Sequence, residues 1–181
     1  MHRPFLRPVP DSAPRPARAG LVQPVAAVLT DCLDDVAVAE AAAGLALAHR
    51  VPLLLITVLP PQARRSGPGS PAVRAVTARV MPRVGPHGTG CITEVLHLPA
   101  GATSRLAAAK GLLALASRHH APHVVTARRG PRGLDAFTLI EAAALRGGPF
   151  VHAVGPTAWT PLCTPPPPHA VRHGEERFRD E

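Results

Sequence analysis

The densest group of basic side chains in the apolar part of the chain is the run Arg128-Arg129-Gly130-Pro131-Arg132-Gly133. Guanidinium groups gathered on one turn can hold a phosphate or a carboxylate through paired hydrogen bonds, because each planar group presents its N–H donors as a fork. A solvated surface turn in an Arg-rich chain would have the same composition. The run follows an apolar segment, where parallel-sheet proteins bind their ligands, and we therefore treat it as a candidate anion site.

Three carboxylates, Asp31, Asp34 and Asp35, follow the apolar run 25–30. Carboxylates at this spacing could bind a metal ion or act as general acid and base. Asp34 is a suitable N-cap for a following helix and Asp35 a suitable acid for its first turn, so neither needs a ligand to explain it. Asp31 ends the run, and we predict that it contacts a ligand. We expect Cys32 to be a buried, unreactive thiol.

His119, His120 and His123 are close in sequence, but Pro122 interrupts a helix between them, so they are not held one turn apart. No neighbouring Cys or carboxylate completes a zinc-type ligand set, and we expect no metal. The sequence also lacks a Gly-x-Ser-x-Gly elbow, a P-loop and a Gly-x-Gly-x-x-Gly turn. We predict no catalytic residues and a role other than catalysis.

Five short apolar runs alternate with helical patterns and must position these side chains. We predict strands at 25–30, 53–59, 92–98, 123–126 and 150–154. We predict helices at 35–49, about 72–83, around Leu106–Ala116 with Thr103 or Ser104 as cap, and 135–146. Continuous apolar strands separated by helices indicate an α/β fold, a doubly wound five-stranded parallel sheet with helices on both faces. Its ligands would bind at the carboxyl ends of the strands.

Composition limits the class of protein. The chain has 181 residues, of which 46% are apolar and 23 are proline, and a formal charge of +8. Prolines gather at both ends, so we predict mobile tails at 1–24 and 156–181 around one domain at 25–155. We expect a cytoplasmic protein with no membrane contact, since no apolar run is long enough to span a bilayer or resembles a secretory signal. With 3% aromatic residues, base-stacking platforms are lacking, and nucleic-acid binding through the basic surface is only a second alternative.

The order of elements and three local segments resemble the universal stress protein family over about 25–155. The segments are Val28-Leu29-Thr30-Asp31, Leu98-Pro99-Ala100-Gly101 and the stretch 122–130. The resemblance implies a sheet ordered 3-2-1-4-5, a homodimer formed through strand 150–154, and ATP binding in one branch of the family. It also implies that Asp31 lies at the nucleotide site.

The ATP-binding branch carries Gly-x-x-Gly and, nine residues later, Gly-Ser/Thr, because glycines let the backbone approach phosphate. Here Ala127 stands at the first glycine and Gly130 at the second; the distal pair falls at Ile140-Glu141 or, with a shortening of three residues, at Phe137-Thr138. We therefore expect weakened or lost ATP binding, no cofactor, and a protein partner or small anionic ligand. The alternative is a nucleotide-binding protein that uses Asp31, Gly130 and the arginines. The candidate ligand-binding residues are Asp31, Arg128, Arg129, Gly130, Arg132, Gly133 and Thr138.

Overall fold

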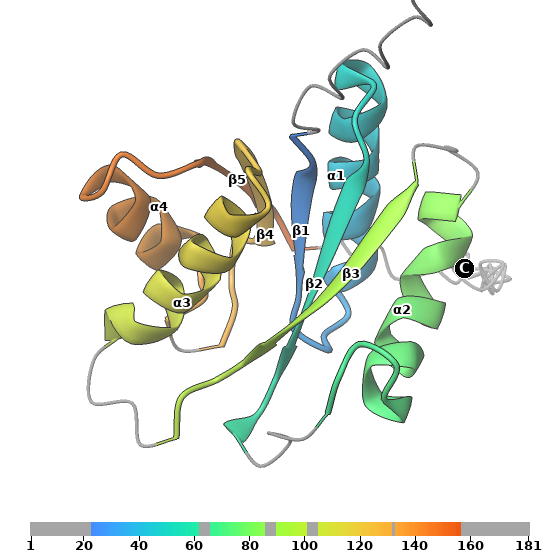
Figure 1. The fold of residues 1–181 in the computed structure, drawn as a ribbon, viewed down its shortest axis with the longest axis horizontal. Helices are drawn as coiled ribbons and strands as arrows, with labels where there is room; N and C mark the ends of the chain where they lie inside the picture. The colour runs from blue at the N-terminus through green and yellow to red at the C-terminus, as the bar shows by residue number, and fades with distance from the viewer. Residues whose placement is uncertain (1–22, 62–65, 86–89, 101–104, 132, 157–181) are drawn as a thin grey trace, which may run out of the picture.

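The computed structural model describes residues 23–61, 66–85, 90–100, 105–131 and 133–156. Nearly all of the two predicted tails, Arg132 and the predicted caps Thr103 and Ser104 lie outside these ranges. Strands and helices alternate along the whole described part of the chain (Figure 1). The elements are β1 (Val25–Leu29), α1 (Asp35–His49), β2 (Leu53–Leu59), α2 (Pro71–Val84), β3 (Cys91–His97), α3 (Arg105–Arg118), β4 (His123–Ala127), α4 (Ala136–Ala144) and β5 (Phe150–Val154).

The five strands form one parallel sheet in the order β3-β2-β1-β4-β5. This confirms the predicted fold class and strand order. The predicted strand and helix boundaries agree with the structure to within one or two residues. They do so because the central strands β1 and β2 are buried along their whole length, which leaves a continuous apolar run in the sequence.

Two apolar cores lie on opposite faces of the sheet, because successive strand side chains point to opposite sides. Ala26 and Val28 of β1 face the core under α3 and α4, whereas Val25, Ala27 and Leu29 face the core under α1 and α2. Figure 1 shows the two helix pairs on either side of the sheet. Helix α1 contributes mainly alanines to its core (Ala39, Ala42, Ala43 and Ala46, all fully buried), which lets it lie close to β1 and β4.

The N-terminus of α1 differs from the prediction. Asp34 has helical backbone angles and makes no side-chain cap hydrogen bond. The next residue, Asp35, accepts hydrogen bonds from the backbone N–H groups of Thr30 and Cys32, which precede the helix. Asp31, between these two donors, has a left-handed backbone (φ 60°).

Candidate functional site

A cavity of about 570 Å³ lies where β1 and β2 end, beside α2 and the turn after β4. Among the lining residues that the structure describes, most are apolar and Asp31 is the charged one. It lies at the carboxyl ends of the strands, where open parallel sheets bind ligands. Its lining residues are Thr30, Asp31, Val58, Leu59, Pro60, Ala72, Ala75, Val76, Leu98 and Pro131.

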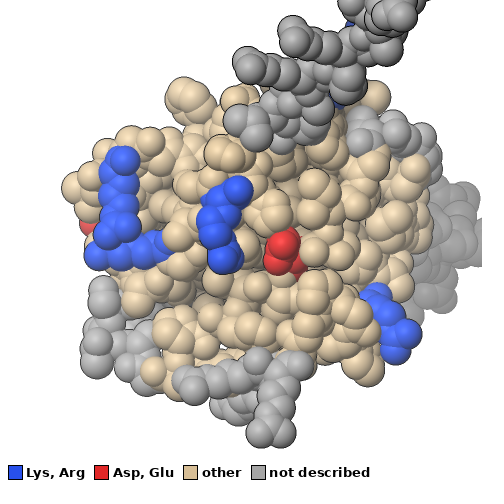
Figure 2. Space-filling view, in the orientation of Figure 1, with Lys and Arg blue, Asp and Glu red and all other residues tan. Residues whose placement is uncertain are grey.

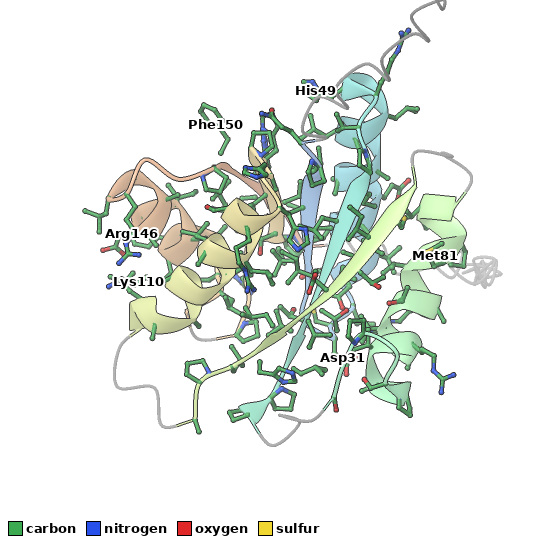
Figure 3. The ribbon with its side chains drawn as sticks, in the orientation of Figure 1. Asp31, His49, Met81, Lys110, Arg146 and Phe150 are labelled. Atoms are coloured by element: carbon green, nitrogen blue, oxygen red, sulfur yellow. The ribbon has the colours of Figure 1, made fainter. Side chains whose placement is uncertain are left out.

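Asp31 is at the mouth of this cavity, at the end of the sheet where the strands finish (Figure 3). Its side chain is 68% exposed and forms an ion pair with Arg79 of α2, with 2.7 Å between Oδ1 and Nη2. Sequence reasoning placed Asp31 here but missed Arg79, which is 48 residues away along the chain. The aspartate predicted to contact a ligand is thus already paired with a cation of the chain itself.

Asp35 is a buried carboxylate that accepts several hydrogen bonds, and only 1% of its side chain is exposed. Its Oδ1 accepts from the N–H of Thr30 at 2.9 Å and its Oδ2 from the N–H of Cys32 at 3.1 Å. The Cys32 thiol donates to Oδ1 at 3.3 Å, and Arg79 Nη2 donates to Oδ2 at 3.3 Å. Cys32 is therefore half-buried rather than buried as predicted, and its thiol is hydrogen-bonded to Asp35. Asp35 thus links the β1–α1 connection to α2 through these hydrogen bonds.

Arg128 and Arg129, in the turn after β4, are exposed to solvent. The backbone of the same turn is closely packed. A Cβ added to Gly130 would lie 2.8 Å from the carbonyl oxygen of Leu134, closer than real Cβ contacts come, so the turn requires glycine. Gly133 is buried and has φ 85°, a conformation that also favours glycine. Both predicted glycines are thus accounted for by the shape of the turn itself.

Thr138 is completely buried in the first turn of α4. Its backbone N–H donates to Asp135 Oδ1 at 3.0 Å, and its hydroxyl donates to Asp135 Oδ2 at 2.7 Å. Asp135 is the N-cap of α4, so its carboxylate stands where the helix N-terminus would hold an anion. The sequence carries a signal for this cap, an Asp three residues before a Thr at the start of an apolar helix, which the site prediction did not use.

Histidines and cysteines do not assemble a metal centre in the described residues, where no three His, Cys, Asp or Glu side chains are placed to share an ion. His119 and His123 are separated, as the interrupted helix predicts. His119 Nε2 lies 3.1 Å from Glu94 Oε1 of β3, while His123 lies against histidines of α1 and β5. Burial raises the pKa of the Cys91 thiol, which favours the neutral form of that group.

Comparison with solved structures decides what the fold resembles. A protein of the universal stress protein family from Burkholderia pseudomallei superposes with a TM-score of 0.52 and 16% identity, over 75% of this chain and 97% of that one. A universal stress protein from Archaeoglobus fulgidus gives 0.51 and 14%, over 72% and 92%. This chain has the universal stress protein fold.

A further universal stress protein, solved in complex with cAMP, superposes with a TM-score of 0.50 and 16% identity, over 74% of this chain and 98% of that one. No protein-family model and no curated protein matches the sequence. The sequence of this chain therefore differs strongly from those of the solved structures that share its fold. Within the described part of the chain, no helix has the length and apolar character needed to cross a membrane.

Proposed function

We propose that this chain is a non-catalytic, cytoplasmic universal stress protein-like binding domain in which ATP binding is weakened or lost. One observation carries the proposal. At the two strand–helix junctions that border the crevice, β1–α1 and β4–α4, several donors that could contribute to a phosphate site are bonded to a carboxylate of the chain. The N–H groups of Thr30 and Cys32 donate to Asp35, and the N–H and hydroxyl of Thr138 donate to Asp135. A phosphate would have to displace a carboxylate from each junction or be held without these donors.

Electrostatics supports the same conclusion. A phosphate brought to the start of α4 would approach the negative charge of Asp135. One brought to the end of β1 would approach the carboxylates of Asp31 and Asp35, which share Arg79 as a cationic partner. The hydroxyl of Thr138, which the resemblance assigns to phosphate, donates to Asp135 instead. Each charged hydrogen bond that ATP fails to make costs about 1.5–3 kcal/mol. Two such losses weaken binding by about two to four orders of magnitude.

The apolar cavity supports a compact ligand as the molecule bound, and the exposed Arg128 and Arg129 support an anionic group on that ligand. These two arginines, and the neighbour solved with cAMP, also favour the alternative, a nucleotide-binding protein that uses Asp31, Gly130 and the arginines at 128, 129 and 132. Nucleic acid is the less favoured partner. On the face in Figure 2 the Lys and Arg side chains lie in separate groups with an acidic group among them, rather than in one basic stripe.

Calorimetry of the full chain with magnesium-ATP tests the proposal. We expect no binding tighter than high micromolar. A submicromolar dissociation constant that Asp31→Ala abolishes would overturn the proposal in favour of the alternative. Because a ligand that binds only the native state raises its stability, a nucleotide-dependent rise in the melting temperature provides an independent readout.

We also propose that the chain forms a homodimer through β5. This strand is at the sheet edge, and Phe150 on it is 73% exposed. Edge strands present unpaired main-chain groups that favour pairing with another strand. The side chain of Val151 packs against the core under α3 and α4, so Val151→Lys would disturb that core as well as the edge. Ala153→Pro, at an exposed position of the edge strand, is the cleaner change.

Sedimentation velocity of wild-type protein and Ala153→Pro at micromolar concentration tests the dimer. We expect a wild-type dimer and a monomeric, folded variant. A wild-type monomer under these conditions contradicts the proposal.

A further inference from the structure

Three histidines from three elements meet at the end of the sheet where the strands begin. His49 ends α1, His123 begins β4 and His152 is the middle residue of β5; we call these residues the imidazole trio. The rings of His49 and His123 stack with centroids 5.3 Å apart, and His123 Nδ1 lies 3.1 Å from His152 Nε2. Figure 3 shows His49 and Phe150 at this end and Asp31 at the opposite one.

The main-chain pairing of β5 determines how a second copy can be added. The N–H of Phe150 donates to Pro122, and the carbonyl of Val154 accepts from Arg128, so the first and last residues of β5 direct these groups toward β4. In a parallel pair such groups alternate along the strand, which leaves Val151 and Ala153 to present theirs outward. An antiparallel copy of β5 would bond to these two residues.

This pairing places the imidazole trio at the dimer interface. Antiparallel overlap of the whole of β5 with its copy is centred on His152, and the two His152 residues then form a pair with no hydrogen bonds between their main chains. In such pairs the Cα atoms are about 4.5 Å apart and both side chains are on one face of the sheet. His123 and His49 stand behind His152 in each copy.

We propose that the imidazole trio is a proton-operated switch of this dimer, in which protonation of the histidines at the β5 edge separates the two copies. The inference rests on the proposed homodimer and concerns its regulation. Neutral imidazoles can face one another across the interface, whereas two charged His152 side chains in directly opposite positions repel. The chain already carries a formal charge of +8, so each added proton increases the repulsion between copies.

The contacts within the imidazole trio make it respond as a unit. A hydrogen bond between His123 Nδ1 and His152 Nε2 needs one proton between the two nitrogens, and full protonation of both rings would bring two N–H groups face to face. The pKa of His123 is held below its ordinary value by burial, then by His152 and then by His49. These neighbours from α1 and β5 are the charged groups that act on it, and Phe150 adds an apolar ring at 5.8 Å. Arg50, directly after His49, brings another positive charge to this end of α1.

Sedimentation equilibrium of the full chain at about pH 7.5 and about pH 5.5 tests the switch. We expect the dimer dissociation constant of the wild type to rise about tenfold or more at the lower pH, because like charges on neighbouring side chains repel across the interface. Circular dichroism at both pH values checks that the chain remains folded. His152→Gln should keep a pH-independent dimer, and His119→Gln, a matched change at a histidine paired with Glu94, should keep the wild-type response.

His49→Gln provides a second variant away from the pairing edge, in case His152→Gln itself weakens the dimer. It should reduce the pH response without loss of the dimer at the higher pH. A dimer with the same dissociation constant at both pH values rejects the switch and leaves the homodimer standing. A monomer at both pH values rejects the homodimer and the switch together. A full response in His49→Gln and His152→Gln assigns the pH dependence to other groups and overturns the proposal.

Discussion

The two ends of the sheet differ in how their polar groups are satisfied. At the carboxyl end, main-chain N–H groups of the β1–α1 connection and of the first turn of α4 are bonded to carboxylates from the same chain, Asp35 and Asp135. At the amino end, the cluster of His49, His123 and His152 is composed of like groups that repel when protonated. Donors at the end where this fold class binds ligands are thus bonded within the chain, whereas the like groups at the opposite end are the basis of the proposed response to pH.

The largest effect is expected at Asp35. Asp35→Ala would leave the half-buried N–H groups of Thr30 and Cys32 without their acceptor and would remove one of the two carboxylate partners of Arg79. We expect the free energy of unfolding to fall by about 3 kcal/mol. Urea unfolding measures this change. Asp34→Ala is the matched control, since Asp34 makes no side-chain cap bond, and a loss there equal to that of Asp35→Ala would contradict the assignment.

Substitutions of Asp135 distinguish its role in stability from its role in repelling anions. Asp135→Ala should cost about 1 kcal/mol, the usual value of an N-cap, whereas Asp135→Ser keeps a capping oxygen and should cost a few tenths. Asp135→Ser also removes the negative charge from the start of α4. We expect it to bind inorganic pyrophosphate about tenfold more tightly than the wild type in calorimetry. Equal, undetectable binding in both proteins would show that Asp135 is only a cap.

Arg79 should matter less than either aspartate for stability. Its side chain is 40% exposed, and its partner Asp31 is 68% exposed, so solvent screens the pair. We expect Arg79→Ala to cost about 1 kcal/mol or less in urea unfolding, mostly through its contact with buried Asp35. If Arg79→Ala lowered the free energy of unfolding as much as Asp35→Ala, Asp35 would not be the main stabilising residue of the carboxyl end.

The smallest expected effect is the pH dependence of folding that His123 contributes. Its folded pKa lies below the ordinary 6.5, so the unfolded chain binds protons more readily there. Stability from this source is therefore complete above pH 6.5 and is lost as pH falls toward the lower folded pKa. Urea unfolding at several pH values between these limits measures how the free energy of unfolding changes with pH. This change should be smaller for His123→Gln than for the wild type. Both proteins are measured below the concentration at which dimers form. An identical change in both proteins would indicate that other groups dominate.

The sequence predicted the fold well because the strands that decide it are buried and continuous. Val25–Leu29 and Leu53–Leu59 contain only residues suited to a buried strand, and the helices between them follow from Ala and Val at helical spacing. The sequence also predicted correctly which end of the sheet would hold Asp31, Arg128 and Arg129. These positions follow from chain order alone.

The contacts of Asp31 and Asp35 could not be predicted in the same way. The ion pair of Arg79 with Asp31 depends on how α2 packs over the strand ends, and no local pattern encodes a contact across 48 residues. Asp35 accepts from residues on either side of Asp31, whose left-handed backbone is an unusual conformation for a residue other than glycine. The Asp135 cap was within reach of sequence reasoning, since its partner Thr138 is three residues away.

Gly130 illustrates how the fold itself can require a residue that a binding motif also contains. The carbonyl of Leu134 occupies the space that any side chain at this position would need. The glycine is thus indispensable to the turn whether or not phosphate ever reaches it. A motif search keyed to this glycine would count a requirement of folding as a signature of nucleotide recognition.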